Sequence, residues 1–171
     1  MTSRKGTVRY LVEAGLIAAL YAVLCLVLQP IAYGSLQFRP AEAMTLLPLI
    51  LPASVPGLTI GCAIANFWSP YGLIDICFGA LATLLAACVT RMIGKKLSFR
   101  KAVWLAPLPP TLFNALIVGG VLTFMTAEEG ARLPAFGVFA FEVGICELAV
   151  CAILGIPLVL AMKRFYHPAS R

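Results

Sequence analysis

Long apolar runs constrain this chain more than any other feature of its sequence. The stretches Tyr10–Leu28 and Leu73–Val89 carry a single charge each, and each is close to the roughly 20 residues of one helical crossing of a bilayer. Of the 171 residues, 61% are hydrophobic and 12% are charged, whereas a soluble domain has about 45–50% and 25%. The sequence therefore predicts an all-α integral membrane protein, with residues 1–171 forming a single membrane-embedded domain.

The basic residues predict how the chain is oriented. Eleven of the 13 lysines and arginines fall into three clusters, at residues 4–9, 91–101 and 163–171. Cytoplasmic loops collect Lys and Arg, so all three clusters are predicted to be cytoplasmic. An even number of crossings must then separate the first two clusters, which requires residues 41–68 to form two short helices. With Trp104–Met125 and Ala135–Met162, this gives a compact bundle of six transmembrane helices with both termini in the cytoplasm.

The stretch YGSLQFRPAEAMTLLP, Tyr33–Pro48, places Gln37, Arg39 and Glu42 between two apolar segments. A charge inside a bilayer costs at least about 2.5–3.5 kcal/mol, so such a cluster needs a partner, a ligand or a wet cavity. A solvated loop with an Arg–Glu pair is the simpler alternative. The predicted topology places further polar residues in or near the extracellular half: Asn66, Asp75, Asn114, Glu142 and Glu147. Their convergence favours an outward-facing pocket.

Several kinds of chemistry have no support in the sequence. It contains no GxxxxGK[ST], HExxH or GxSxG motif, and the sole histidine, His167, lies in the C-terminal tail, so ATP hydrolysis and other enzymatic activity are not expected. The six cysteines form no CxxC pair, so neither a metal nor a cofactor is predicted. Basic residues at helix ends do not indicate nucleic acid. The sequence favours a binder of a small polar solute that needs an energised partner.

Four segments between Val12 and Met162 resemble the QueT family of queuosine-precursor transporters: YGSLQFRPAEAMTLLP, PGLTIGCAIAN, LIDICFGALATLLAA and ICELAVCAILGIPL. The resemblance implies a substrate-binding S component of an energy-coupling factor (ECF) transporter in a bacterial plasma membrane. Such a protein captures 7-cyano- or 7-aminomethyl-7-deazaguanine from outside and works with a transmembrane coupling protein and two ATPase subunits. Between Arg39 and Glu42 this chain has Pro40 and Ala41, where the family commonly has a β-branched residue and Ser, so no hydroxyl role is carried over.

A deazaguanine ligand would present two adjacent N–H donors and one carbonyl acceptor. A carboxylate can accept both donors, and an amide or guanidinium can donate to the carbonyl. We expect Glu147 or Glu42 to accept the donor pair, and Asn66, Asn114 or Gln37 to bind the carbonyl.

Other residues near this site have two interpretations each. Asp75 is either the alternative acid or the N-cap of its helix. Arg39 is expected to pair with Glu42 in preference to the ligand. Phe38 could stack on the ring; Trp68 and Tyr71 could also stack, or lie at the membrane interface.

Ala14, Ala18 and Ala22 form a stripe of small residues on one face of the first helix. Such a stripe lets another helix approach closely. It either packs inside the bundle or, as the resemblance to the family's alanine docking motif implies, contacts the coupling protein. Two alternative functions stay open: an S component for another vitamin-like solute, and a membrane assembly protein whose acids pair only with neighbouring helices.

Overall fold

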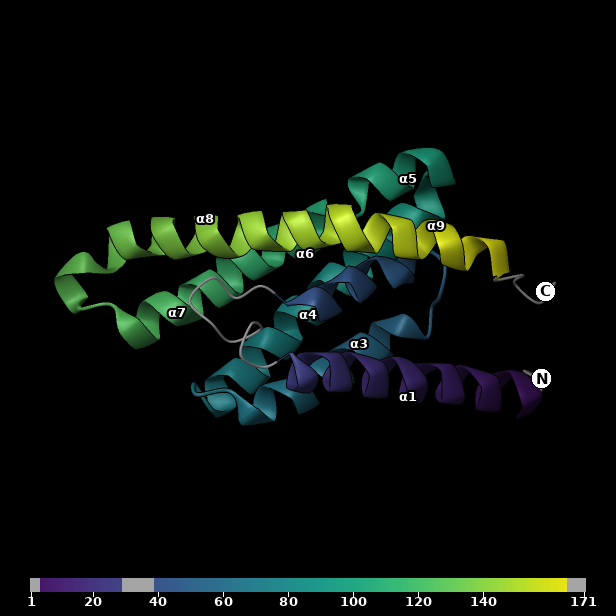
Figure 1. Ribbon diagram of the computed structural model, residues 1–171, viewed down its shortest axis with the longest axis horizontal. Coiled ribbons are helices and arrows are strands. Elements are labelled where there is room, and N and C mark those ends of the chain that lie inside the picture. The colour runs from purple at the N-terminus through teal and green to yellow at the C-terminus, as the bar shows by residue number, and fades with distance from the viewer. Residues whose placement is uncertain (1–3, 29–38, 166–171) are drawn as a thin grey trace.

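A computed structural model of the chain describes residues 4–28 and 39–165 (Figure 1). All regular elements within these residues are helical, which confirms the predicted all-α class. In chain order they are α1 (Arg4–Val27), η1 (Pro40–Leu49), α3 (Ser54–Ala65), η2 (Asn66–Trp68), α4 (Leu73–Lys96), α5 (Phe99–Leu105), α6 (Leu108–Phe113), η3 (Asn114–Val118), α7 (Gly119–Thr126), η4 (Glu129–Ala131), α8 (Arg132–Val150), η5 (Cys151–Gly155) and α9 (Ile156–Phe165).

Four helical stretches among the described residues are long and apolar enough to cross a membrane. They are Gly6–Val27, Leu73–Lys96, Phe99–Thr126 and Glu129–Phe165. The last has 37 residues, about 55 Å of helix, which exceeds the roughly 30 Å of hydrocarbon in a bilayer. This stretch must therefore tilt or project beyond the membrane.

Residues 41–68 do form two short helices, η1 and α3, as predicted. Arg39, just before η1, pairs with Asp75 near the start of α4, and Arg91 near the end of α4 donates to the carbonyl of Pro48, near the end of η1. η1 thus runs along most of α4. It can do so because it is a 3-10 helix, in which ten residues rise about 20 Å instead of the 15 Å of an α-helix. Both helices are shorter than the four long stretches, so the count of six crossings stays a prediction.

The alanine stripe of α1 packs inside the bundle against α3. A Cβ added at Gly57 would lie 2.8 Å from the carbonyl oxygen of Ala14, and one added at Gly61 would lie 2.8 Å from that of Ala18. Ala14, Ala18 and Ala22 are accordingly buried. The close approach of small residues is thus used within the chain, which favours internal packing of the stripe over its alternative role as a docking face.

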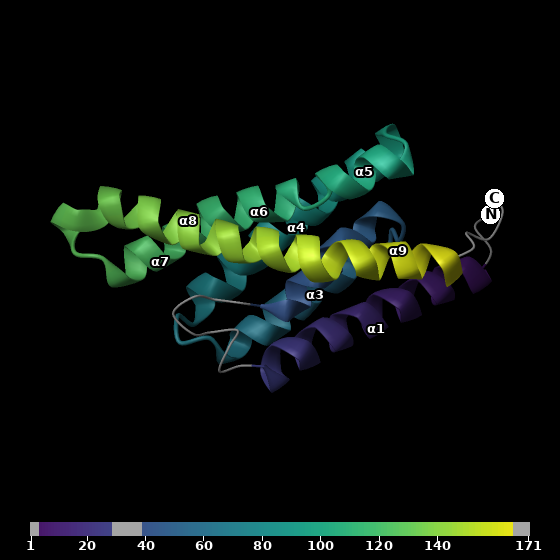
Figure 2. The same ribbon diagram turned by 45° about the horizontal axis from the view of Figure 1, so that its top comes forward.

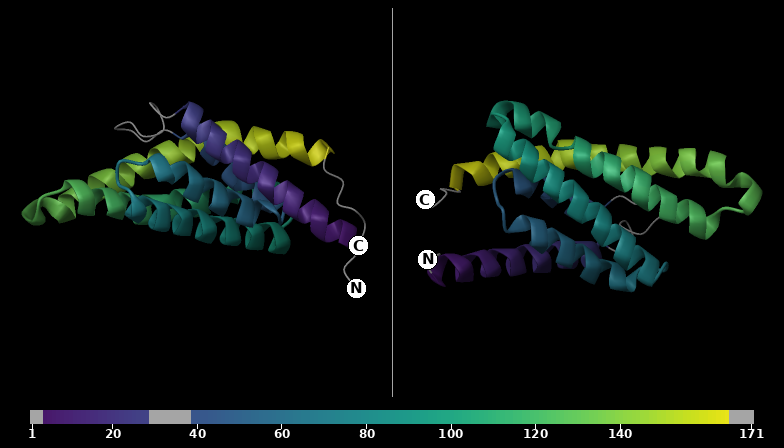
Figure 3. Two further views of the ribbon diagram at one scale, coloured as in Figure 1. Left: turned by 90° about the horizontal axis from the view of Figure 1, so that it is seen from below. Right: turned by 180° about the vertical axis from the view of Figure 1, so that it is seen from behind.

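Successive passes along the bundle alternate in direction. Gly57 and Gly61 meet α1 in parallel order, whereas Gly119 of α7 meets Ala140 of α8 in an antiparallel hairpin. α1 begins and α9 ends at the same end of the bundle, called here the terminal end (Figure 2). At the opposite, far end, the α7–α8 hairpin projects past the other helices (Figure 3). The start of α1 and the end of α9 thus lie together. The predicted cytoplasmic location of both termini stays a prediction.

The buried apolar residues form two clusters. The larger one joins α1, η1, α3, α5 and α9 around Tyr21, Leu46 and Leu58. The smaller one joins α4, η3, α7 and α8, and consists of Ala82, Val118, Leu122 and Val143. Polar residues gather where these clusters meet, and they form the candidate site.

Candidate functional site

Six polar side chains predicted from the sequence are buried in the structure. They are Arg39, Glu42, Asn66, Asp75, Asn114 and Glu147, each less than a tenth exposed. They come from η1 and the residue before it, η2, α4, η3 and α8, so segments distant in sequence converge on one region. Buried polar and charged groups are costly unless they are paired or serve a ligand, so each one requires an account.

Arg39 lies between η1 and the start of α4. Its Nη1 donates to Oδ1 of Asn66 at 3.4 Å, and its Nη2 lies 3.8 Å from Oδ2 of Asp75. The same guanidinium lines a cavity with Glu42. The sequence predicts Glu42 as the partner of Arg39, whereas the ion pair that the structure shows for Arg39 is with Asp75.

Asn66 connects α3, α4 and Arg39. Its Nδ2 donates to the carbonyl of Asp75 at 3.0 Å, while its Oδ1 accepts from Arg39. The amide lies so close to Gly79 that any side chain there would collide with it. Asn66 was predicted as a ligand contact, but its amide is engaged in holding the helix junction and Arg39.

Asp75 does not cap its helix. The N-cap of α4 is Gly72, which has a φ of +62° and makes no side-chain cap hydrogen bond. Asp75 instead lies in the first turn, where a carboxylate is favoured by the helix dipole, and faces Arg39. The N-cap interpretation was therefore wrong, and the residue acts as an ion-pair partner.

Glu42 is held by a residue that the sequence analysis did not identify. The hydroxyl of Tyr21, which is fully buried in α1, donates to Oε1 of Glu42. Oε2 of Glu42 is buried too and has no hydrogen-bond partner among the residues that the structure describes. Tyr21 falls three residues after Ala18 on the buried face of α1, and this helical spacing was the signal that could have placed it beside the site.

Glu147 lies on α8, facing Glu42 across the cavity. Its Oε1 is 3.5 Å from Sγ of Cys151, and the same sulfur lies 3.5 Å from Oγ1 of Thr45 in η1. Cys151 thus connects the carboxylate of α8 to η1. Neither Cys151 nor Thr45 was predicted, because Cys in an apolar run ordinarily behaves as a small hydrophobe.

Two π-helical segments border the site. η3 begins at Asn114, and η5 begins at Cys151, one turn after Glu147. Single π turns inside α-helices occur frequently at functional sites, since they widen the helix and shift the direction of its side chains. Both site-bearing helices of the C-terminal half carry one.

The cavity itself is lined by Arg39, Glu42, Asn114, Val118, Val143 and Glu147. It offers two carboxylates, one guanidinium, one amide and two apolar side chains. Its volume is about 10 Å³, which is close to the space needed by one water molecule. This set of groups suits a polar solute rich in hydrogen-bond donors, but a bicyclic ring enters only if the lining moves apart. No group of three or more His, Cys, Asp or Glu residues within the described chain could hold a metal ion.

The remaining predicted residues lie elsewhere. Gln37 and Phe38 fall outside the described residues. Trp68 is 52% exposed and forms an edge-on ring contact with Phe67, and Tyr71 packs against the smaller apolar cluster. Neither aromatic ring lines the cavity with Glu42 and Glu147, so the structure favours their interpretation as peripheral aromatics.

Apolar helices of membrane length around a buried polar cavity define a membrane protein with a polar site inside its bundle. A model of the QueT transporter family matches residues 11–164, which is most of the chain. The chain belongs to the QueT transporter family.

One relative can be compared directly. The queuosine precursor transporter QueT of Lactococcus lactis subsp. cremoris (strain MG1363) is 33% identical over 84 residues. The aligned stretch spans 48% of this chain and 49% of that protein, about half of each. No solved structure matches the chain.

Proposed function

We propose that this chain is the substrate-binding S component of an ECF importer that captures a queuosine precursor, 7-cyano- or 7-aminomethyl-7-deazaguanine. The observation that carries the proposal is the buried cavity between Glu42 and Glu147, in a chain of the QueT transporter family. The name of the Lactococcus relative supports the same class of substrate.

The two carboxylates are the proposed acceptors of hydrogen bonds from the adjacent N–H donors of the deazaguanine. The ring N–H and the exocyclic amine lie side by side, and a single carboxylate accepts both. Oε2 of Glu42 has no hydrogen-bond partner in the described part of the chain, so it is available to accept from a ligand. Glu147 lines the same cavity. Asn114 is then the donor to the ring carbonyl, while Val118 and Val143 contact the apolar faces of the ring.

Binding requires the cavity to expand. Glu42 belongs to the N-terminal half, whereas Asn114 and Glu147 belong to the α6–α9 half, so separation of the two halves would enlarge it. The described conformation is then a contracted form of the site. Buried polar groups that are satisfied only by the ligand favour selectivity, because an analogue lacking a donor leaves a buried acceptor unpaired.

The basic clusters support an orientation with the terminal end in the cytoplasm. Lys95, Lys96, Lys163 and Arg164 all lie in the last turns of helices that end there. By the positive-inside rule, the far end then faces the outside, and six crossings place both termini inside. The substrate would enter from the far end.

Import would depend on partners, because the sequence has no phosphate-binding loop of its own. A transmembrane coupling protein and two ATPase subunits are the proposed energising module. The proposed contact with the module lies at another surface of the bundle, because Ala14, Ala18 and Ala22 are buried and α3 packs on the first two.

Calorimetric titration of the purified chain with each deazaguanine tests the proposal. We expect tight binding without ATP, at least about a hundredfold weaker in Glu147→Ala, because an unpaired donor pair costs several kcal/mol. Glu142→Ala is the matched control, since Glu142 lies on the same helix, is only partly buried and does not line the cavity. Absence of binding to either deazaguanine, or equal binding by wild type and Glu147→Ala, would overturn the proposal.

A further inference from the structure

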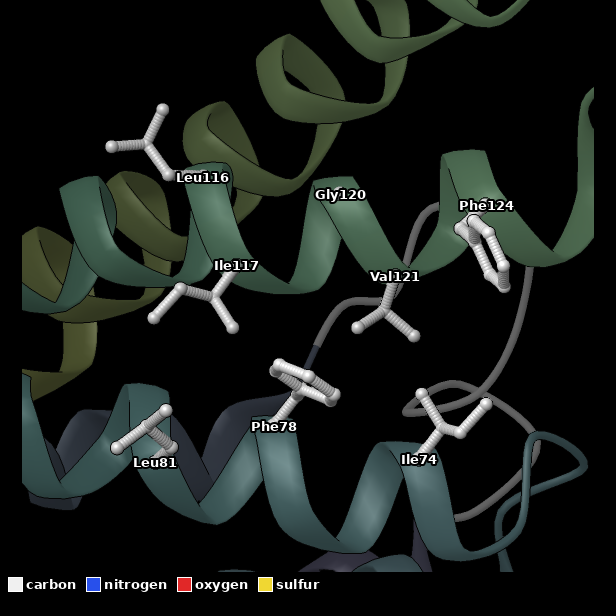
Figure 4. Close-up of a pocket in the computed structure, with 8 residues that line it drawn as sticks. All are labelled: Ile74, Phe78, Leu81, Leu116, Ile117, Gly120, Val121 and Phe124. Atoms are coloured by element: carbon white, nitrogen blue, oxygen red, sulfur yellow. The ribbon is translucent and has the colours of Figure 1, made fainter.

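A second, wholly apolar hollow lies between α4 and the η3–α7 segment, on the side of α7 away from the polar site. Its volume is about 520 Å³. Ile117 and Val121 point from one helix toward Phe78 and Ile74 on the other (Figure 4), and Gly120 also lines the hollow. α4 packs closely on η3 but only weakly on α7, so this groove widens toward the far end.

The groove is short enough to fit within one leaflet of a membrane. Its α4 wall runs from Ile74 to Leu81, which is about 12 Å of helix, less than the roughly 15 Å of one hydrocarbon leaflet. Phe78 and Phe124 are about half exposed or more, so the groove is open at its side. In the hydrocarbon region, the surrounding medium consists of acyl chains, and an apolar wall offers water no hydrogen bonds.

A basic residue marks the wide end of the groove. The guanidinium of Arg132 lies 5.2 Å from the centre of the Phe124 ring, and Phe124 and Gly120 line both this groove and an adjoining hollow that contains Arg132. Nε of Arg132 is buried and has no hydrogen-bond partner among the described residues. Its Nη1 lies 3.8 Å from Glu129, but the side chain of Glu129 is 90% exposed, so this pair is weak.

The position of Arg132 is unusual for this chain. Eleven of the 13 basic residues fall in the three clusters, and of the other two, Arg39 serves the polar site. Arg132 is thus a far-end cation with no part in that site. An apolar groove with an arginine at its end is complementary to a phospholipid, in which a phosphate group lies next to apolar acyl chains. Guanidinium and phosphate form charge-assisted hydrogen bonds.

We propose that this groove binds one phospholipid, with an acyl chain along Phe78, Ile117 and Val121 and its phosphate on Arg132. The groove favours an acyl chain over a partner helix because a helix is about 10 Å wide, so 520 Å³ would admit little more than one of its turns. The lipid wedges α4 and α7 apart at the far end. The site is independent of the polar cavity and of its ligand.

Native mass spectrometry of the intact protein, with added phosphatidylglycerol as the probe, tests this site. Gly120→Leu should abolish retention of one phosphatidylglycerol, because Leu would occupy the wall that the groove shares with the hollow that contains Arg132. A Cβ at Gly120 comes no closer than 3.9 Å to any neighbour, so the helix accepts the substitution. Gly137→Leu is the control, since nothing lies within 4 Å of a Cβ there, and it should retain the lipid.

The headgroup contact is tested separately. Arg132→Gln should weaken phosphatidylglycerol binding about tenfold, and Arg100→Gln at the terminal end should not. Diacylglycerol with the same acyl chains, which lacks the phosphate, should bind weakly to wild type and equally to Arg132→Gln. Equal lipid retention by wild type, Gly120→Leu and Arg132→Gln would overturn the proposal. So would a change of oligomeric state in Gly120→Leu with lipid retention unchanged, because the groove would then hold a second copy of the chain.

Discussion

At the contact between α1 and α3, Gly57 and Gly61 bring two helix backbones together, whereas between α4 and α7 a groove of about 520 Å³ stays open. Each contact involves at least one helix of membrane length, and both contain glycine. In the first, the space left by glycine is filled by the carbonyl oxygens of Ala14 and Ala18. In the second, a Cβ added at Gly120 would meet only the Phe136 ring of α8, at 3.9 Å, and no described atom of α4 lies within 4 Å of it.

This difference indicates two halves with distinct roles. The N-terminal half is a closely packed support that holds Arg39 and Glu42 through Asn66 and Tyr21. The α7–α8 hairpin packs more loosely on α4 and belongs to the half that carries Asn114 and Glu147. The polar site lies between the two halves, so the proposed expansion of the cavity requires one half to move against the other.

The largest expected effect is in the close contact. Gly61→Leu should lower the free energy of unfolding by about 3 kcal/mol, because its Cβ would meet the Ala18 backbone and Tyr21, neither of which can rotate away. Titration with a denaturing detergent, followed by loss of helical circular dichroism, measures this. The same substitution at Gly137, which is open, should change stability by less than about 1 kcal/mol. Equal effects at the two positions would show that the α1–α3 contact is not close-packed.

An intermediate effect is expected where the support meets the site. Tyr21→Phe should weaken deazaguanine binding by at least about tenfold, since it removes the hydroxyl that donates to Glu42 and a hydrogen bond to a charged group contributes about 1.5–3 kcal/mol. Calorimetric titration measures the affinity. Tyr10→Phe, at an exposed position of the same helix, should bind as wild type does. If both variants bind normally, Tyr21 has no part in positioning the carboxylate.

The smallest effect is expected in the groove. Gly120→Ala should raise the free energy of unfolding by about 0.5–1 kcal/mol, because Ala favours the helix and its Cβ has space. The detergent titration used for Gly61→Leu detects this gain. A loss of stability instead would mean that α7 lies closer to its neighbours than the structure has it, and the contrast with α1–α3 would fail.

Much of the fold could be predicted from the sequence, because long apolar runs have few solutions in a bilayer. The two short helices in residues 41–68 followed from counting crossings between basic clusters. The 3-10 conformation of η1 did not, since nothing in PAEAMTLLPL distinguishes a tight helix from an ordinary one. Nor could the sequence predict which helix packs against the alanine stripe, because small residues indicate a close contact but do not identify the helix that makes it.

The charged residues of the candidate site could be predicted from the sequence, but the side chains that contact them could not. Arg39, Glu42 and Glu147 were found because charge in an apolar chain is conspicuous. Tyr21 and Cys151 were missed because both are ordinary residues in apolar helices, and only the fold brings them to Glu42 and Glu147. Asn66 was identified, but its engagement with Asp75 and Arg39 depends on a helix junction that sequence spacing does not reveal.

The central claim is that a carboxylate of this cavity accepts hydrogen bonds from the ring N–H and the exocyclic amine of a deazaguanine. Its most direct test compares the affinity of 7-cyano-7-deazaguanine with that of the analogue lacking the exocyclic amine, for wild type, Glu42→Gln and Glu147→Gln. The account predicts that wild type prefers the parent compound by about a hundredfold or more, and that one of the two variants reduces this preference below about tenfold. An equal preference in all three proteins would contradict the account.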